Sequence, residues 1–230
     1  MTLEEKMHIN GYVVGNFSDK GGINHLEDLI NNITNDNIKS GFSLKEKYKS
    51  SLDLKPNVFL YDEVFMNILF DNNIHKMINK ATGVNLYLAH IQLRIAYPSS
   101  KGGYIKWHRD THFYNNHTIT GNIPPVYKLI HYPALDGQET RQLGIIKGSH
   151  NFIFNSKLTD MLYARIAKPI IISSDRSSFI FFNTSVLHKA INPVLDDGSV
   201  RLIYSFARED QLSKYDGELP EMYKNRLKGL

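Results

Sequence analysis

The chain has 230 residues, of which 42% are hydrophobic and 22% charged, and its formal net charge is +4 at pH 7. These are the values of an ordinary globular protein, and they argue against a disordered chain or a coiled coil. The sequence contains no cysteine, which excludes disulfides, zinc–thiolate sites, iron–sulfur clusters and a cysteine nucleophile. Metal chemistry would therefore have to use histidine and carboxylate ligands.

The charge pattern and the start of the chain indicate where the protein acts. Lys and Arg form no block, so we expect no nucleic-acid partner. Residues 1–6 carry two glutamates and no apolar core, unlike a signal peptide. No apolar run reaches the roughly 18 residues that a membrane span needs. We therefore expect a cytoplasmic monomer or homodimer that acts on a small molecule without membrane contact.

The first third of the chain, residues 1–83, is predicted to be mainly helical. A short strand is expected over residues 9–17. One helical face is then formed by apolar residues at helical spacing, namely Ile23, Leu26, Leu29, Ile30 and Ile33. A second helix is predicted from an N-cap at Asp62 to a stop at Gly83. The polar stretch 39–57 between the two helices is expected to be a loop and a candidate lid.

From residue 84 on, short strand patterns alternate with turn residues. The first strand is expected over residues 84–97, with one side formed by Leu86, Leu88, His90, Gln92, Arg94 and Ala96. Further strands are expected over residues 126–132, 143–146, 169–172, 179–182 and 200–206. Such a series is typical of a sandwich, barrel or jelly roll rather than of βαβ units. We predict a single domain, with a jelly-roll core over residues 84–208 and a C-terminal tail over residues 209–230.

One short segment contains the residue types of a metal site. The sequence lacks GxGxxG, P-loop, GxSxG and HExxH motifs, which argues against dehydrogenases, NTPases, common hydrolases and zincin proteases. Residues 107–112 read Trp-His-Arg-Asp-Thr-His. In an extended segment alternate side chains point to the same side, so His108 and Asp110 can present an imidazole and a carboxylate to one point. Such a pair alone is weak evidence, because a polar loop explains it equally well.

Two later residues extend this pattern. An apolar run leads into His188, and two histidines with one carboxylate form the facial triad of non-haem Fe(II) oxygenases. The alternative is a structural histidine at a strand end. Arg201 lies in an apolar strand and needs a partner there. A bidentate carboxylate ligand fits its guanidinium, and a salt bridge with Asp175 or Glu209 is the alternative.

The combined pattern resembles the Fe(II)/2-oxoglutarate-dependent dioxygenases, and among them the phytanoyl-CoA dioxygenase family. Residues 143–150, Leu-Gly-Ile-Ile-Lys-Gly-Ser-His, are similar to the G-x-L-x-x-x-P-G-S-H segment of that family, with Lys147 where proline is usual. The resemblance covers residues 84–208. It implies a mainly β fold with flanking helices, a double-stranded β-helix of the cupin-like jelly-roll type.

The resemblance also implies a reaction. Fe(II) would be bound by His108, Asp110 and His188. Arg201 would bind the distal carboxylate of the co-substrate 2-oxoglutarate, with Gln92 and Ser205 near it. With O2, the enzyme would hydroxylate an unactivated C–H of a small, polar metabolite and release succinate and CO2. Relatives that halogenate lack the carboxylate of Asp110, so halogenation is disfavoured. Some relatives carry a hydroxyl where Ile203 stands, and Ser205 is the candidate replacement.

The substrate residues are predicted less sharply. The polar candidates are His112, Lys128, His131 and Arg141, which suit a small polar or anionic substrate. The aromatic residues near the motif, Trp107, Tyr104, Phe113 and Tyr114, are candidates to line a pocket, but such residues are more often plain packing. Residues 113–125 are a second candidate lid. Two other functions stay open. One is a zinc metallohydrolase that uses His108, Asp110 and His112, and the other is a non-catalytic jelly-roll binding protein with structural histidines.

Overall fold

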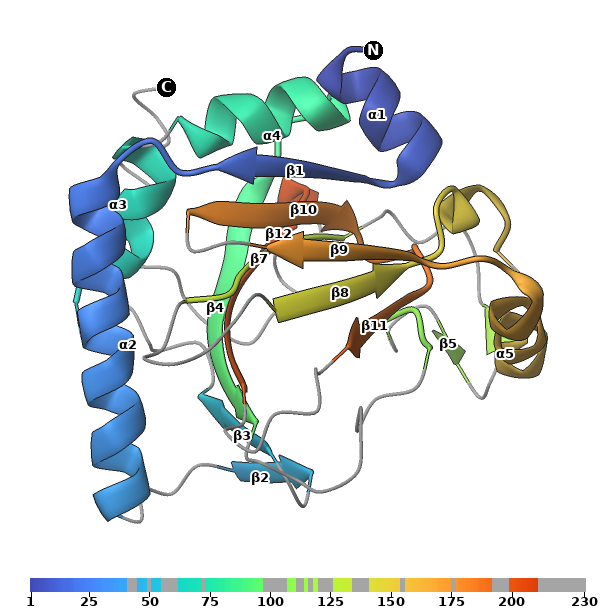
Figure 1. Cartoon of the computed structure of the whole chain (residues 1–230). Helices are drawn as coiled ribbons and strands as arrows, with labels where there is room; N and C mark the ends of the chain where they lie inside the picture. Colours follow the sequence, from blue (N-terminus) through green and yellow to red (C-terminus); the bar gives the residue numbers. More distant parts are fainter. Residues whose placement is uncertain are drawn as a thin grey trace.

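Two antiparallel sheets face each other in the computed structural model, and helices cover the outer side of the larger sheet (Figure 1). The structure describes residues 1–40, 45–48, 51–54, 62–71, 73–96, 107–110, 114–115, 118–119, 126–133, 141–153, 156–174, 177–191 and 199–210. The two facing sheets and the helices that cover the larger one confirm the predicted jelly roll with flanking helices. Residues 211–230, most of the expected C-terminal tail, lie outside the described part.

The helices begin and end at recognisable signals. Their bounds are α1 Leu3–Asn10, α2 Lys20–Ser40, α3 Val64–Asp71, α4 Ile74–Thr82, α5 Lys157–Ile166 and the 3-10 turn η3 Ser149–Asn151. Thr2 and Glu5 form a capping box at the start of α1. Gly11 caps the C-terminal end of α1 and Gly83 that of α4, and both glycines are left-handed, with φ of 79° and 68°. The predicted stop at Gly83 is thereby confirmed.

The larger sheet has seven strands in the order β1-β10-β7-β12-β4-β3-β2, and the smaller sheet has three in the order β11-β8-β9. A separate pair joins β5 and β6. The strands are β1 Tyr12–Asn16, β2 Lys45–Tyr48, β3 Ser51–Leu54, β4 Tyr87–Ala96, β5 Tyr114–Asn115, β6 Thr118–Ile119, β7 Tyr127–His131, β8 Arg141–Ile145, β9 Ile170–Ser174, β10 Ser178–Asn183, β11 His188–Ile191 and β12 Ser199–Ala207. The rest of the candidate lid 113–125 lies outside the described residues.

The larger sheet has a different apolar core on each face. On its outer face α2, α3 and α4 pack against β4, β7, β10 and β12. On its inner face Ile130 of β7 and Ile203 of β12 pack against Leu143 and Ile145 of β8 in the smaller sheet. Because neighbouring residues of a strand point to opposite faces, every second residue of β4, β7 and β12 points between the two sheets. The candidate site uses these inward positions.

Two expectations for the first third of the chain are wrong. The stretch 39–57 was expected to be a loop, but β2 and β3 form a hairpin that extends the edge of the larger sheet. An antiparallel edge can face water, so its polar sequence does not prevent a strand. The helix expected up to Gly83 is two helices, because Asn73 adopts a left-handed φ of 51° between α3 and α4. Asp62 does accept a hydrogen bond from the Val64 N–H at 2.8 Å.

The side chains expected to share one side of the strand over residues 84–97 do so only in part. Ser205 of β12 pairs with His90, but the next residue, Phe206, pairs with Leu88. The extra residue is a β-bulge, and a bulge reverses which side chains share a face. Leu86 and Leu88 therefore join Ile91 and Leu93 in the outer core, whereas His90, Gln92 and Arg94 point to the inner face. This reversal brings polar groups of β4 to the side of the candidate site.

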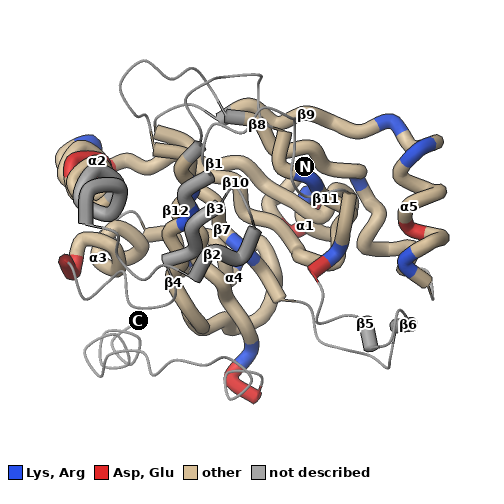
Figure 2. Tube along the Cα trace, turned by 90° about the horizontal axis from the view of Figure 1, so that it is seen from below, with Lys and Arg blue, Asp and Glu red and all other residues tan. Residues whose placement is uncertain are grey.

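Positive and negative residues lie near one another along the backbone of α2 and α5 (Figure 2). Two of the acidic residues on these helices, Glu27 and Asp160, are buried. None of the described helices combines the length and apolar character of a membrane span. α1, α5, β11 and the β5–β6 pair were not expected from the sequence, and two of these, α5 and β11, help to build the site.

Candidate active site

Three potential metal ligands meet where the smaller sheet begins. His108 and Asp110 come from the extended segment 107–110, and His188 is the first residue of β11. One ligand atom of each residue lies within 4.8 Å of the others. The rings of His108 and His188 are 4.4 Å apart between centroids. The structure therefore brings together the three residues that the sequence singled out as iron ligands.

The backbone fixes this convergence. The amide of His108 donates to the carbonyl of His188 at 3.1 Å, and the amide of His188 donates back at 3.0 Å. The amide of Asp110 donates to the carbonyl of Thr184 at 3.4 Å. The segment with two candidate ligands is thereby attached, residue by residue, to the segment that leads into the third.

His188 is prepared to act as a neutral ligand. Its side chain is buried, and its Nδ1 lies 2.8 Å from the carbonyl oxygen of Val186. Only a protonated Nδ1 can donate to that oxygen, so Nε2 keeps its lone pair for a metal. Burial, followed by the charge of His108, lowers the pKa of His188 to about 3. The imidazole is therefore neutral at physiological pH, as metal binding requires.

Lys128 supplies a positive charge beside the candidate carboxylate ligand. It lies on β7, and its Nζ is 3.3 Å from both Oδ1 and Oδ2 of Asp110. Both side chains are largely buried, with 22% and 14% of their surface exposed. An ion pair at this depth keeps Asp110 ionised, which is the form that binds a metal.

The residues proposed for the co-substrate lie on the inner face of β4 and β12. Arg201 is buried, at 5% exposure, and pairs in register with Arg94. Gln92 pairs with Ile203, and Ser205 pairs with His90, whose Nε2 lies 3.1 Å from the Ser205 hydroxyl. Arg201 and Ser205 therefore share one face of β12, as expected. Two alternative partners were expected for Arg201. Glu209 is exposed beyond the end of β12, and Asp175 lies outside the described residues.

The remaining candidates are placed unevenly. Trp107 is half-buried and packs against the cluster of Ile146, Ala164 and Leu187. His131 was expected to face the site, but it points to the outer core, with its ring 5.1 Å from that of Phe17 and its Nδ1 3.1 Å from the Ser178 carbonyl. Its position on β7 alternates with that of Lys128, so the two cannot face the same side.

Two more candidates cannot be placed at the site. His112 lies outside the described residues, and the side chain of Arg141, the first residue of β8, does too. Of the substrate candidates, Lys128 thus lies beside the candidate ligand Asp110, whereas Trp107 belongs to a packing cluster.

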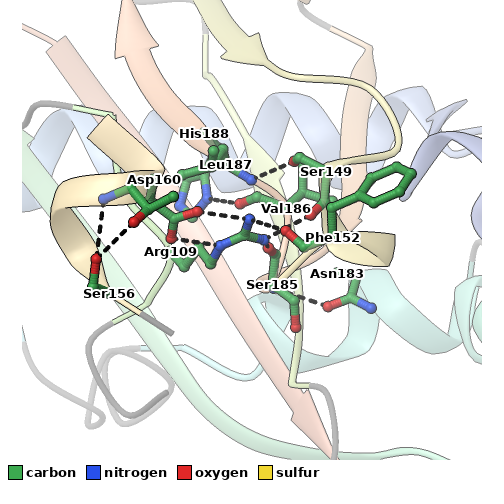
Figure 3. Close-up of polar contacts among 11 residues, drawn as sticks. Arg109, Ser149, Phe152, Ser156, Asp160, Asn183, Ser185, Val186, Leu187 and His188 are labelled. Carbon is green, nitrogen blue, oxygen red and sulfur yellow. Dashed lines mark hydrogen bonds and ion pairs between the residues drawn. The ribbon is translucent and has the colours of Figure 1, made fainter. Parts of the chain in front are cut away.

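The residue between the first two ligands was missed by the sequence analysis. Arg109 is 1% exposed and uses all five of its side-chain N–H groups (Figure 3). Its Nε and Nη2 donate to the two carboxylate oxygens of Asp160 at 2.7 and 2.9 Å. Nη1 donates to the carbonyls of Ser149, at 2.9 Å, and Ser185, and Nη2 donates to that of Phe152 at 2.9 Å. No spacing rule links residue 109 to residue 160, so the sequence offered little signal for this pair.

The Gly-Ser-His segment connects α1 with the candidate ligands. Gly148 is left-handed, with a φ of 74°, and its amide donates to the carbonyl of Asn10 at 3.1 Å. The buried hydroxyl of Ser149 accepts the amide of Leu187 at 2.8 Å, one residue before His188. His150 Nε2 lies 2.9 Å from the carbonyl oxygen of His8. Residues 148–150 thus connect α1 with the segment that leads into His188, and we call them the Gly-Ser-His joint.

No protein-family model and no curated protein sequence matches this chain. Several solved structures share its fold. The structure of EvdMO1 has a TM-score of 0.68 at 15% identity over 90% of this chain, which spans only about half, 49%, of that chain. EctD from S. alaskensis, solved with 2-oxoglutarate and 5-hydroxyectoine, has a TM-score of 0.64 at 12% identity, over 90% of this chain and 75% of EctD.

A third neighbour is SnoN from nogalamycin biosynthesis, a non-haem α-ketoglutarate-dependent epimerase. It has a TM-score of 0.64 at 10% identity, over 89% of this chain and 80% of SnoN. At identities this low, the likeness to all three proteins shows a shared fold.

Proposed function

We propose that this chain is an Fe(II)- and 2-oxoglutarate-dependent dioxygenase, similar to the phytanoyl-CoA dioxygenase family, that hydroxylates a small polar metabolite. The observation that carries the proposal is the meeting of His108, Asp110 and His188 within 4.8 Å. Two neutral imidazoles and one carboxylate are the donor set of non-haem Fe(II) oxygenases. The shared fold with EctD, solved with 2-oxoglutarate, supports the same reading.

The donor chemistry of the three residues fits an Fe(II) ion. His188 offers Nε2, because its Nδ1–H is engaged with Val186, and Asp110 is ionised beside Lys128. His108 completes the set from the same extended segment as Asp110. When bound, iron and 2-oxoglutarate together supply the oxidising power that replaces a C–H by a C–OH, with O2 consumed and succinate and CO2 released.

Arg201 is the proposed anchor for the co-substrate. A buried guanidinium strongly favours a carboxylate partner, and its planar fork can bind both oxygens at once. Gln92 and Ser205, on the same inner face, would complete the polar surroundings of 2-oxoglutarate. Their role is to orient the co-substrate toward the three ligands rather than to take part in bond breaking.

Lys128 is the proposed substrate contact. Once a metal takes up the negative charge of Asp110, the Nζ group 3.3 Å away is free to pair with an anionic group of the substrate. Trp107, His112 and Arg141 remain weaker candidates for the same role. Because Asp110 is present, we expect the product to gain oxygen rather than a halogen.

An epimerase is the second candidate function. SnoN, which has the same fold, is by name an α-ketoglutarate-dependent epimerase, so co-substrate use alone does not define the product. Hydroxylation adds the mass of one oxygen atom to the substrate, whereas epimerisation leaves its mass unchanged. Mass spectrometry of the product therefore separates the two reactions.

A succinate-release screen tests the proposal. The purified protein, loaded anaerobically with Fe(II), would be exposed to air with 2-oxoglutarate, ascorbate and a library of small polar and anionic metabolites. We expect substrate-dependent succinate from the wild type and none from the His188→Ala variant. If the purified chain instead bound zinc, did not bind 2-oxoglutarate and hydrolysed a substrate, the result would support the metallohydrolase.

A further inference from the structure

The Arg109 side chain connects separate parts of the chain that meet at the candidate site. Its own backbone lies between His108 and Asp110. Its guanidinium reaches Ser185, in the turn that leads to His188, and Ser149 and Phe152, in and after η3 (Figure 3). One side chain therefore links both ligand-bearing segments to the Gly-Ser-His joint.

Asp160 balances this buried charge. It is 2% exposed and lies in the first turn of α5, where a negative charge is also favoured by the helix dipole. Its two oxygens receive a bidentate pair of hydrogen bonds from Arg109, the strongest common geometry for such a pair. Because α5 also packs against Leu187 and Ile146 through Ala164, the ion pair attaches the ligand segments to a helix.

Backbone hydrogen bonds and side-chain contacts also hold the two ligand segments in place. His108 belongs to no strand of either sheet and contacts His188 through an isolated bridge. The turn before His188 is held by side chains, since Asn183 Oδ1 accepts the Ser185 amide at 2.9 Å and Ser149 accepts the Leu187 amide. Metal ligands must be held to within about 0.5 Å of their working positions. A rigid partner outside the sheets would supply that precision.

We infer that the Arg109–Asp160 ion pair is a positioning lock that sets the relative placement of the three candidate ligands. This inference rests on the proposed metal site. The Arg109 guanidinium donates its hydrogen bonds to Asp160 and to three backbone carbonyls. It would therefore act on the ligands through the backbone of residues 108–110 and 185–188. Residues that orient metal ligands typically change metal affinity by about 10–100-fold when they are altered.

The test compares two ways of weakening the region around α5. Asp160→Asn keeps the shape of the side chain but removes the charge opposite Arg109. Arg109→Lys keeps the charge but loses the planar fork. The matched control is Ser156→Ala, which removes the N-cap of α5, where Ser156 Oγ accepts the Thr159 amide at 3.2 Å. The control weakens the same helix without touching the ion pair.

The first readout is metal affinity, measured by anaerobic titration of each metal-free protein with Co(II), whose visible bands also report ligand geometry. We expect Asp160→Asn and Arg109→Lys to bind Co(II) at least about tenfold more weakly, with altered bands. Ser156→Ala should stay within about twofold of the wild type. Folded variants with wild-type affinity and bands would overturn the inference.

The second readout needs no metal. Amide hydrogen exchange at His108 and His188 reports the two backbone bonds between the ligand segments. The lock predicts exchange at these two amides at least about tenfold faster in Asp160→Asn, with the Leu202 amide in β12 unchanged. If the wild type binds no Co(II) or Fe(II), the proposed function fails and exchange alone decides the lock. If neither variant folds, the pair serves the fold as a whole and the inference is overturned.

Discussion

His108 and His188 exchange both of their backbone hydrogen bonds, at 3.1 and 3.0 Å. In an antiparallel arrangement two residues that do so stand directly opposite each other, and their side chains leave the backbone on the same side. The closeness of the two imidazoles is therefore a matter of register between two distant chain segments. A shift by one residue would turn one histidine away from the other.

Replacing any one ligand should abolish iron binding. In His108→Ala, Asp110→Ala and His188→Ala only two of three protein ligands remain, so we expect loss of Fe(II) binding and of turnover, with the circular dichroism spectrum largely unchanged. Bound iron is measured after anaerobic loading and desalting. His112→Ala is the comparison variant and should retain its iron. Wild-type iron in His188→Ala would contradict the triad, and loss of metal in His112→Ala would favour the hydrolase.

Arg201→Lys should weaken binding of 2-oxoglutarate. A lysine keeps the charge but replaces the planar fork by a point donor. Loss of part of a charge-assisted pair costs on the order of 1.5–3 kcal/mol, and about tenfold or more in affinity. The affinity is measured by titrating 2-oxoglutarate into the anaerobic Fe(II) protein and following the visible charge-transfer band.

The control for Arg201 lies just beyond the end of the same strand. Arg208 forms an exposed pair with Asp210 at 3.1 Å, so Arg208→Lys should leave the midpoint of the titration unchanged. An unchanged midpoint in Arg201→Lys as well would mean that Arg201 serves the fold and does not bind 2-oxoglutarate.

Features that depend on local patterns, such as strand positions and the faces of neighbouring side chains, could be predicted from the sequence. Strand periodicity located β4, β7, β8, β9, β10 and β12, and the alternation of the segment around His108 and Asp110 predicted that both residues face one point. Side-chain alternation is a property of the extended backbone, so it can be predicted from the sequence wherever no bulge interrupts the strand. The meeting with His188 was inferred from a familiar pattern of ligands rather than from periodicity.

Most of the failures involve partners distant in the chain, whereas the helix break at Asn73 and the outward face of His131 are local. The bulge that turns His90 to the inner face is visible only when β4 is paired with β12. The edge hairpin of β2 and β3 is polar and owes its strands to pairing with β4. Arg109 looked like the variable residue of a short motif, and its five hydrogen bonds end on residues 40 or more positions away. Local sequence rules contain no information on such contacts.

A buried histidine far from the site should make folding sensitive to acid. His75 on α4 packs between Phe70 and Phe206, and burial lowers its pKa from 6.5 to about 4. The unfolded chain therefore binds a proton between pH 6.5 and pH 4 that the folded chain does not. The free energy of unfolding should fall over this range by on the order of 3 kcal/mol from this group.

Urea unfolding of the wild type and of His75→Leu at several pH values between 7 and 4 measures this contribution. We expect stability to decrease less with falling pH in His75→Leu than in the wild type. Some decrease should remain, because His150 and His188, whose pKa values are also lowered, are present in both proteins. Phe70→Leu, which changes the packing against His75, should lower stability without flattening its pH dependence. Parallel curves for the wild type and His75→Leu would show that His75 is not the cause.

Lys128→Met should increase metal affinity. The ammonium of Lys128 lies 3.3 Å from both oxygens of Asp110, so a metal cation competes with it for the same carboxylate. Two cations separated by a few ångströms repel each other by several kcal/mol even at an effective dielectric constant of about 20, and reorganisation of the lysine offsets most of that. We expect Co(II) to bind about tenfold more tightly to the variant at low salt.

The control for Lys128 is Lys189→Met. Lys189 directly follows His188 but pairs with Gly144 and points to the opposite face of β11. The same loss of charge there should change Co(II) affinity by less than about twofold, because solvent and salt screen it. If Lys128→Met bound Co(II) more weakly than the wild type, the lysine would be orienting Asp110 for the metal rather than competing with it. In that case Lys128 would not be released to bind an anionic substrate, and the proposed substrate contact would be wrong.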